Sequence, residues 1–155
     1  MKTKTTPDAV RHELQVALPP EQAFALFTRG ISRWWPFDGH SCSGDQALGV
    51  EFEERVGGAV TEIARDGSRF PWGTVTAWEP PGFFEMTWHP AHDAAQATGL
   101  SVRCLATGGG CRVALCHDGW AARGAEAEEV RDGYQQGWAL VLGLFAAAAA
   151  QENRP

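Results

Sequence analysis

The hydrophobic pattern is clearest over residues 124–150, where apolar and aromatic positions recur every three or four residues. These positions are Ala127, Val130, Tyr134, Trp138, Val141, Leu142, Phe145 and Ala149. Such spacing places them on one side of an α-helix, so it predicts a long amphipathic helix of roughly 40 Å. We expect Trp138 and Tyr134 to face a sheet, while Glu128 and Glu129 lie on the solvent side near the positive end of the helix dipole.

Two glycines, Gly133 and Gly137, lie one turn apart inside this predicted helix. Each costs about 0.5–1 kcal/mol of helix stability relative to alanine, so a compensating reason is expected. Close packing of the helix on a sheet is the favoured reason. The alternative is room for a ligand beside Tyr134 and Trp138.

Before this helix, apolar and polar residues alternate with a period of two, which is typical of strands with one buried face. The predicted strands are residues 10–18, 48–56, 60–65, 72–78, 84–88, 100–105 and 113–117. Gly57 and Gly58 predict a tight hairpin turn between the second and third strands. Residues 89–97 are expected to form a loop.

Two short helical segments are predicted after the first strand. Residues 21–28 follow two prolines and form a short helix, and residues 31–42 form a half-helical cap or a loop. The whole order favours an α+β fold in which a curved antiparallel β-sheet wraps around the long C-terminal helix.

The composition is that of one globular domain, with 155 residues, 44% hydrophobic and 21% charged. We expect a domain over residues 10–150, a disordered segment over 1–9 and a tail over 151–155. The net charge is −6 and no lysine follows Lys4, so the chain offers no basic stripe for a nucleic acid.

The N-terminus lacks the apolar core of a signal peptide, and the longest apolar run, residues 139–150, belongs to the amphipathic helix. We therefore expect a soluble, cytoplasmic protein without a membrane span. In that compartment the four cysteines are most simply reduced thiols.

Several short motifs, in this order, resemble a known superfamily. They are Arg33-Trp34-Trp35-Pro36 with His40, Gly57-Gly58, Trp72-Gly73, Trp78-Glu79-Pro80-Pro81, Thr87-Trp88, His117-Asp118-Gly119-Trp120, Gly133-Tyr134 and Gly137-Trp138 before Leu142. Together they resemble the SRPBCC (START-like, Bet v 1-like) superfamily, and most closely the group related to the C-terminal domain of the Hsp90 ATPase activator Aha1. The resemblance runs from about Val10 to Phe145.

The resemblance implies a helix-grip fold with a cavity between sheet and helix. Members of the superfamily bind lipids, hormones and polyketides, and a few are cyclases or hydrolases. The resemblance carries over no universal catalytic motif and no cofactor. The eukaryotic co-chaperone also has a separate N-terminal Hsp90-binding domain, for which the nine residues before the first strand are too few, so an Hsp90-type chaperone is a less favoured partner.

We expect the cavity to be lined mainly by aromatic residues, with a few polar groups. The candidate ligand-binding residues are Trp34, Trp35, His40, Phe52, Glu62, Trp72, Trp88, His117, Tyr134 and Trp138. Trp34 and Trp35 are expected near the entrance, although the segment that carries them is equally consistent with a plain packed cap.

Glu62 and His117 are the two candidates for acid–base chemistry. If the face of its strand that carries Glu62 is concave, burial raises the pKa of its carboxyl, as a general acid or base requires; the favoured alternative is an outward-facing surface residue. His117 is a proton-transfer or ligand-orienting residue, or else a core histidine with satisfied hydrogen bonds.

The sequence predicts no metal site. His89, His92 and Asp93 lie close together in the chain, but no further ligand is placed near them, and a solvated loop is the favoured interpretation.

Three functional hypotheses follow. The first is a protein that binds a small hydrophobic or aromatic ligand, without catalysis. The second is a cyclase- or hydrolase-type enzyme that uses the same cavity, and the third is a co-chaperone-like interaction module.

Overall fold

Seven antiparallel strands form one sheet, in the order β1-β7-β6-β5-β4-β3-β2, in the computed structural model, which describes residues 7–152. The strands are β1 (Val10–Val16), β2 (Ala47–Phe52), β3 (Ala59–Ala64), β4 (Arg69–Glu79), β5 (Phe83–Trp88), β6 (Thr98–Thr107) and β7 (Gly110–Asp118). Strands β2 to β7 pair in chain order, and β1 pairs with β7, with Val10 opposite His117. The prediction of seven strands is confirmed.

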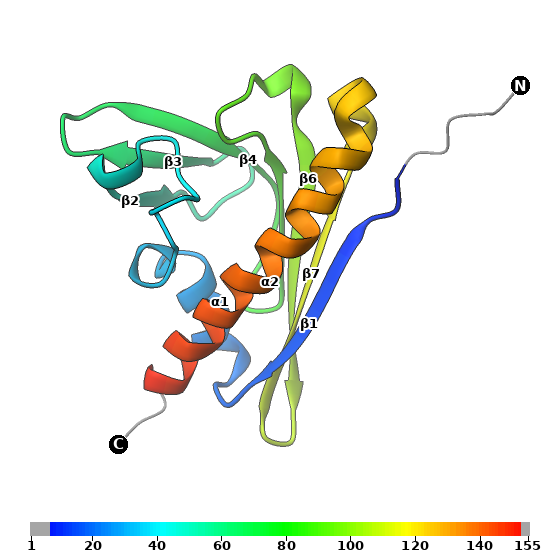
Figure 1. The fold of residues 1–155 in the computed structure, drawn as a ribbon. Coiled ribbons are helices and arrows are strands. Elements are labelled where there is room, and N and C mark those ends of the chain that lie inside the picture. Colours follow the sequence, from blue (N-terminus) through cyan, green and yellow to red (C-terminus); the bar gives the residue numbers. More distant parts are fainter. Residues whose placement is uncertain (1–6, 153–155) are drawn as a thin grey trace, which may run out of the picture.

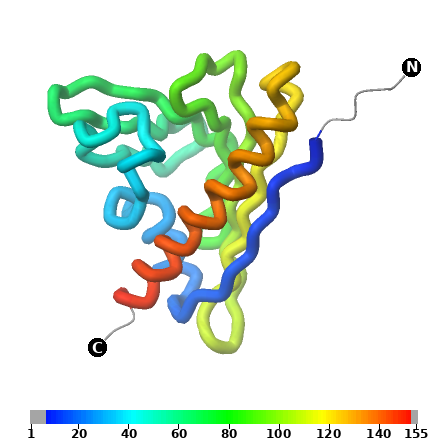
Figure 2. Tube along the Cα trace, viewed as in Figure 1, coloured from blue at the N-terminus to red at the C-terminus, as the bar shows by residue number. Residues whose placement is uncertain are grey.

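The long helix α2 runs obliquely across the concave side of this sheet (Figure 1). The helical elements are α1 (Pro20–Phe27), α2 (Ala127–Glu152) and four 3-10 helices, η1 (Ile31–Arg33), η2 (Gly44–Gln46), η3 (Ala94–Gln96) and η4 (Trp120–Glu126). The trace in Figure 2 shows α1 beside the C-terminal half of α2. This arrangement is the predicted α+β helix-grip fold.

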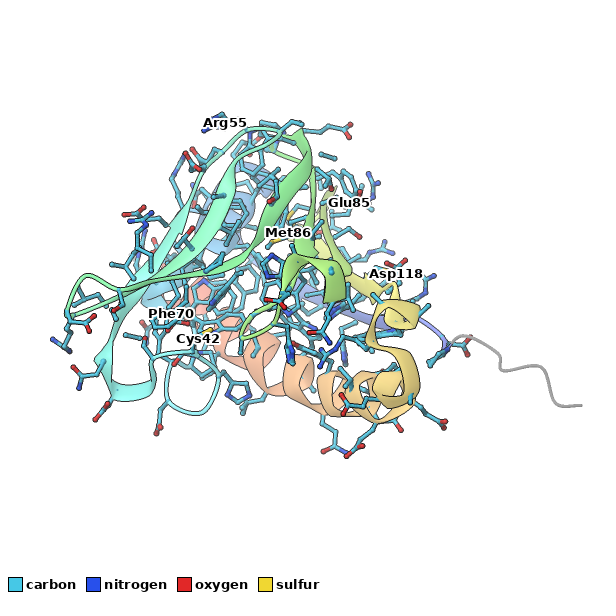
Figure 3. The ribbon with its side chains drawn as sticks, turned by 90° about the horizontal axis from the view of Figure 1, so that it is seen from above. Cys42, Arg55, Phe70, Glu85, Met86 and Asp118 are labelled. Atoms are coloured by element: carbon cyan, nitrogen blue, oxygen red, sulfur yellow. The ribbon has the colours of Figure 1, made fainter. Side chains whose placement is uncertain are left out.

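Alternation along the strands decides which residues enter the core. On β7, Cys111, Val113 and Leu115 are buried, and the residues between them are more exposed. Figure 3 shows the same alternation on β5, where Met86 lies inside and Glu85 outside. The period-two pattern of the sequence is therefore the inside–outside pattern of a sheet with one covered face.

The rotation of α2 also agrees with its sequence. Trp138 and Phe145 are buried against the sheet and α1, with 2% and 0% of their surface exposed, and Glu128 and Glu129 are exposed. Burial of the apolar stripe fixes this rotation, because every other rotation would bring acidic residues to the sheet.

The start of the long helix differs from the prediction. The helix begins at Ala127, because Gly124, with φ 60° and ψ −131°, separates it from η4. The predicted turn between β2 and β3 is present, because the N–H of Gly58 donates to the carbonyl of Arg55 at 2.9 Å and Gly57 has a φ of 83°. The N–H of Gly57 also donates to the carbonyl of Val75 on β4. Residues 31–42 form the single 3-10 turn η1 followed by a loop, which agrees with the expected half-helical cap or loop. The segments expected at 1–9 and 151–155 lie largely outside the described residues, and α2 continues to Glu152.

The middle of the grip is filled by aromatic rings. The ring centroids of Trp35 and Trp72 are 4.9 Å apart, and those of Trp88 and Trp138 are 5.3 Å apart. A cavity of only about 10 Å³ is left among these rings and the neighbouring core residues. Indoles of this size bridge helix and sheet here, so no ligand-sized space remains within the aromatic layer itself.

The burial of Trp138 generates a prediction about stability. Replacing Trp138 by Ala should lower the free energy of unfolding by about 3–5 kcal/mol, because a large side chain is removed from a packed core. Urea denaturation measures the change. Leu140, which is 54% exposed on the opposite side of α2, gives the control Leu140→Ala, with an expected change below about 1 kcal/mol. Equal effects of the two substitutions would mean that the helix is not gripped at Trp138.

Candidate functional site

A half-open pocket of about 250 Å³ lies beside the aromatic layer, between α2, the loop that precedes β2 and the loop that follows β5. Its lining is mostly apolar. The lining residues are Trp35, Gly39, His40, Ser41, Cys42, Trp72, Trp88, Pro90, Ala91, Tyr134, Gly137, Trp138 and Val141. Cys42 is labelled in Figure 3, on the loop that faces α2. Aromatic walls with a few polar groups are typical of small-molecule sites.

A second depression, of about 380 Å³, lies between α1 and the end of α2. Its lining includes Arg29, Arg33 and Glu152, and the exposed ion pair between Arg33 and Glu152 crosses it. Exposed, solvated charges of this kind do not shape a specific apolar site, so the aromatic pocket is the candidate.

Gly137 provides part of the space in the pocket. A Cβ atom built at Gly137 would have no heavy atom within 4 Å, and the same holds at Gly133, which is exposed and outside the pocket. Close helix-to-sheet packing, the reason favoured from the sequence, is therefore wrong for both glycines. At Gly137 the missing side chain leaves open volume inside the pocket.

The wall opposite α2 is held in place by Glu62 on β3. Its carboxylate accepts hydrogen bonds from the backbone N–H of Cys42 at 2.9 Å and of Ser43 at 2.7 Å, and from the Ser43 hydroxyl. It also accepts one from Nε1 of Trp72 at 3.1 Å. One buried carboxylate thus joins a loop and an indole that both border the pocket.

The acid–base role considered for Glu62 does not fit this arrangement. The side chain is fully buried, so the favoured interpretation as a surface residue was wrong. Burial by itself raises the pKa of the carboxyl, but the hydrogen bonds from Ser43, Cys42 and Trp72 outweigh it and lower that pKa below its ordinary value. Glu62 is therefore an ionised structural acceptor behind the wall and does not line the pocket.

His117 is a core histidine whose two ring nitrogens are both paired. Trp138 donates from Nε1 to Nδ1 of His117 at 2.9 Å, so Nδ1 is the unprotonated nitrogen. Nε2 then donates to the Thr98 hydroxyl at 2.6 Å, and that hydroxyl donates to the carbonyl of Trp88. Burial lowers the pKa of His117 to about 3, which keeps the ring neutral at physiological pH.

The indole N–H groups of the pocket wall are all used inside the protein. Trp35 donates to the carbonyl of His40 at 2.8 Å, and Trp72 and Trp138 donate to Glu62 and His117. The fourth, on Trp88, donates to the hydroxyl oxygen of Tyr134 at 3.1 Å. These four rings therefore offer a ligand their faces and edges but no free donor.

The structure brings six of the ten predicted site residues together around the pocket: Trp35, His40, Trp72, Trp88, Tyr134 and Trp138. The other four are not among its lining. Trp34, expected at the entrance, is buried and donates to the carbonyl of Leu26, and Phe52 packs on Trp78 and Phe84. Glu62 and His117 lie behind the wall, as described above.

Sequence reasoning missed the loop residues of the lining, among them Cys42, Pro90 and Ala91. Loops have no periodicity from which a facing direction can be read. Ala91 has a φ of 65°, the only positive φ of a non-glycine residue in the described part of the chain. Such strain often occurs where a loop borders a binding site, but alanine gives no sign of it in the sequence.

The loop that carries His89 and His92 is ordered by its own contacts. Nδ1 of His89 lies 3.0 Å from the carbonyl of His92, and Nε2 of His92 lies 3.0 Å from a guanidinium nitrogen of Arg123. Within residues 7–152, no group of three or more histidine, cysteine or acidic side chains is arranged to hold a metal ion. The four cysteines are free, and no helix over these residues is long and apolar enough to cross a membrane.

Comparison with known proteins adds a family match. The family model described as "Activator of Hsp90 ATPase homolog 1-like protein" matches residues 17–150. A search of curated proteins finds no significant match.

Solved structures of similar fold cover nearly the whole chain. Protein MLL2253 from Mesorhizobium loti is 18% identical with a TM-score of 0.71, over 96% of this chain and 100% of that one. The Aha1 dimer from Colwellia psychrerythraea is 15% identical with a TM-score of 0.65, over 92% and 96%. The anthrahydroquino-γ-pyrone synthase Txn09 is 29% identical with a TM-score of 0.62, over 92% and 97%.

The neutral state of His117 predicts how stability depends on pH. The folded-state pKa lies near 3 and the ordinary value is 6.5, so below pH 6.5 the unfolded chain takes up a proton that the folded chain does not. His117 should therefore destabilise the fold by about 1.4 kcal/mol per pH unit as the pH falls from 6.5 towards 3. Urea denaturation should show that the free energy of unfolding falls less between pH 7 and pH 5 in His117→Gln than in the wild type. In the exposed control His92→Gln, the free energy of unfolding should fall as much as in the wild type. If it also falls that much in His117→Gln, His117 is not the buried neutral histidine described here.

The hydrogen bonds of Glu62 predict a second pH effect. Replacing Glu62 by Gln should lower the free energy of unfolding by at least about 1–3 kcal/mol at pH 7, because an amide NH₂ then faces N–H donors. The lowered pKa means that the stabilisation is present above the ordinary value of 4.5 and is lost as the pH falls through the folded-state pKa. The difference in the free energy of unfolding between the wild type and Glu62→Gln should become smaller in that acid range. Glu51→Gln, at an exposed position paired with Arg69, is the control, with an expected cost below about 1 kcal/mol.

Proposed function

Because this chain belongs to the family of Activator of Hsp90 ATPase homolog 1-like proteins, as its match over residues 17–150 shows, we propose that it uses the helix-grip fold to bind a small, flat, apolar ligand. The ligand occupies the half-open pocket beside Gly137. The family match also confirms the resemblance to Aha1-related proteins of the SRPBCC superfamily.

The observation that carries this proposal is the pocket itself. Four indole rings and Tyr134 surround about 250 Å³ of space, and Gly137 leaves part of that space open at a cost to helix stability. The volume is slightly below the usual range of roughly 300–1,000 Å³, which favours a ligand of few rings that stays partly exposed at the mouth. Aromatic faces and edges favour flat ligands through stacked and edge-to-face contacts.

A cyclase-type activity in the same pocket is the second candidate, and the similarity to Txn09 favours it. That protein, at 29% identity, is described as an anthrahydroquino-γ-pyrone synthase, and the description of this relative supports a flat aromatic ligand here too. Glu62 and His117 do not supply the acid–base chemistry, because the first is held by four donors and the second is enclosed and neutral. An enzyme would have to use the groups that do line the pocket.

A chaperone partner has less support. The words "Activator of Hsp90 ATPase" in the family description are the basis for it, and no feature of the pocket or of the described surface adds to them.

The two helix glycines give a matched test of ligand binding. The neutral dye N-phenylnaphthylamine should bind the wild type saturably, with enhanced dye emission and quenched tryptophan emission. Gly137→Ala should weaken the binding at least about tenfold, because the added methyl group enters the pocket, whereas Gly133→Ala should stay within about twofold. Both variants should gain about 0.5–1 kcal/mol of helix stability, which separates binding from folding.

The proposal would be abandoned if the dye did not bind saturably, or if both alanine variants bound it like the wild type. Equal weakening in both variants would likewise place the binding outside the pocket.

A further inference from the structure

The pocket contains one strong hydrogen-bond donor that the protein itself does not use. Tyr134 accepts from Nε1 of Trp88 at 3.1 Å, which occupies a lone pair of its oxygen. Among the residues that the structure describes, no acceptor lies within hydrogen-bonding distance of this oxygen, so its O–H proton is unpaired. A ligand that offers an acceptor at this point would therefore form a hydrogen bond that no protein group forms with the hydroxyl.

The direction of this hydroxyl is fixed by packing. The Tyr134 ring lies 4.7 Å from the ring of His117 and 5.7 Å from that of Trp120, and its plane is 27° from that of Trp138. The bond from Trp88 holds the oxygen in place as well. Tyr134 is among the residues that line the pocket, on the wall that α2 provides.

The remaining polar groups of the lining narrow the ligand class. The Ser41 hydroxyl already donates to the carbonyl of Phe37 and accepts from the N–H of Gly44. The buried Nδ1 of His40 has no hydrogen-bond partner, and the Cys42 thiol is only a weak donor. No aspartate, glutamate, lysine or arginine is among the lining residues, so the pocket provides no counter-ion for a charged ligand.

We propose that the pocket selects neutral, flat aromatic ketones or quinones, whose carbonyl oxygen accepts a hydrogen bond from the Tyr134 hydroxyl while the ring system lies among the indoles. This inference rests on the proposed function and specifies the ligand class of the same site. A carbonyl oxygen at the edge of an aromatic ring lies in the ring plane, so one rigid ligand satisfies both the donor and the aromatic walls. Burial raises the pKa of Tyr134, so the hydroxyl remains a donor at neutral pH.

Indane and indanone form a matched pair for the test, because they have the same ring framework and only indanone has a carbonyl group. Displacement of N-phenylnaphthylamine gives the dissociation constants of both compounds for the wild type and for Tyr134→Phe. The ratio of the indane constant to the indanone constant should fall about three- to tenfold in Tyr134→Phe, the usual effect of losing one neutral hydrogen bond. Both constants are measured on one sample, so the ratio does not depend on how much of a variant is folded.

Gly133→Ala is the control, because Gly133 lies on the same helix but is exposed and outside the pocket. Its ratio should stay within about twofold of the wild-type ratio. If Tyr134→Phe weakens both compounds equally, the tyrosine only shapes the pocket and the inference is wrong, while the proposed function stands. If neither compound displaces the dye and the dye itself does not bind, the proposed function fails, and the inference fails with it.

Discussion

The four indoles around the pocket donate their N–H groups to acceptors inside the protein, and this pairing organises the wall of the site. Seven tryptophans give the chain enough aromatic surface to fill the space between a curved sheet and a straight helix, but each buried N–H loses its water. The acceptors are polar groups placed inside the core, such as Glu62 for Trp72 and His117 for Trp138. Polar residues that resemble catalytic candidates in the sequence are therefore partners of the aromatic layer.

The fold could be predicted from the sequence because its signals belong to the backbone. A strand turns its side chains alternately to two faces and a helix repeats every 3.6 residues, so the apolar positions alone identify the seven strands and the buried side of α2. Details that depend on single glycines were less predictable. The sequence does not reveal that Gly57 pairs with β4, or that Gly124 delays the start of the helix to Ala127, because both depend on contacts or dihedral angles that only the folded chain defines.

The candidate site was only partly predictable. Trp34 and Trp35 are neighbours, yet Trp35 lines the pocket and Trp34 is buried beside α1, because the irregular turn after η1 turns the two rings in different directions. The hydrogen-bond donors around Glu62 could not be predicted from the sequence for another reason. Its loop donors, Cys42 and Ser43, lie 20 and 19 residues away in the chain, so the change from a raised to a lowered pKa depends on a tertiary contact.

The order of the elements has a consequence for synthesis on the ribosome. All seven strands precede α2, so the complete sheet, ending at Asp118, can emerge before the helix that covers it begins at Ala127. Until α2 has emerged, the concave face exposes Trp72, Trp88 and their neighbours to solvent and to other nascent chains. Such exposed aromatic surface invites aggregation and binding by general chaperones. Helix α2, which forms one side of the pocket, is thus also the segment whose synthesis ends the exposure of the concave face.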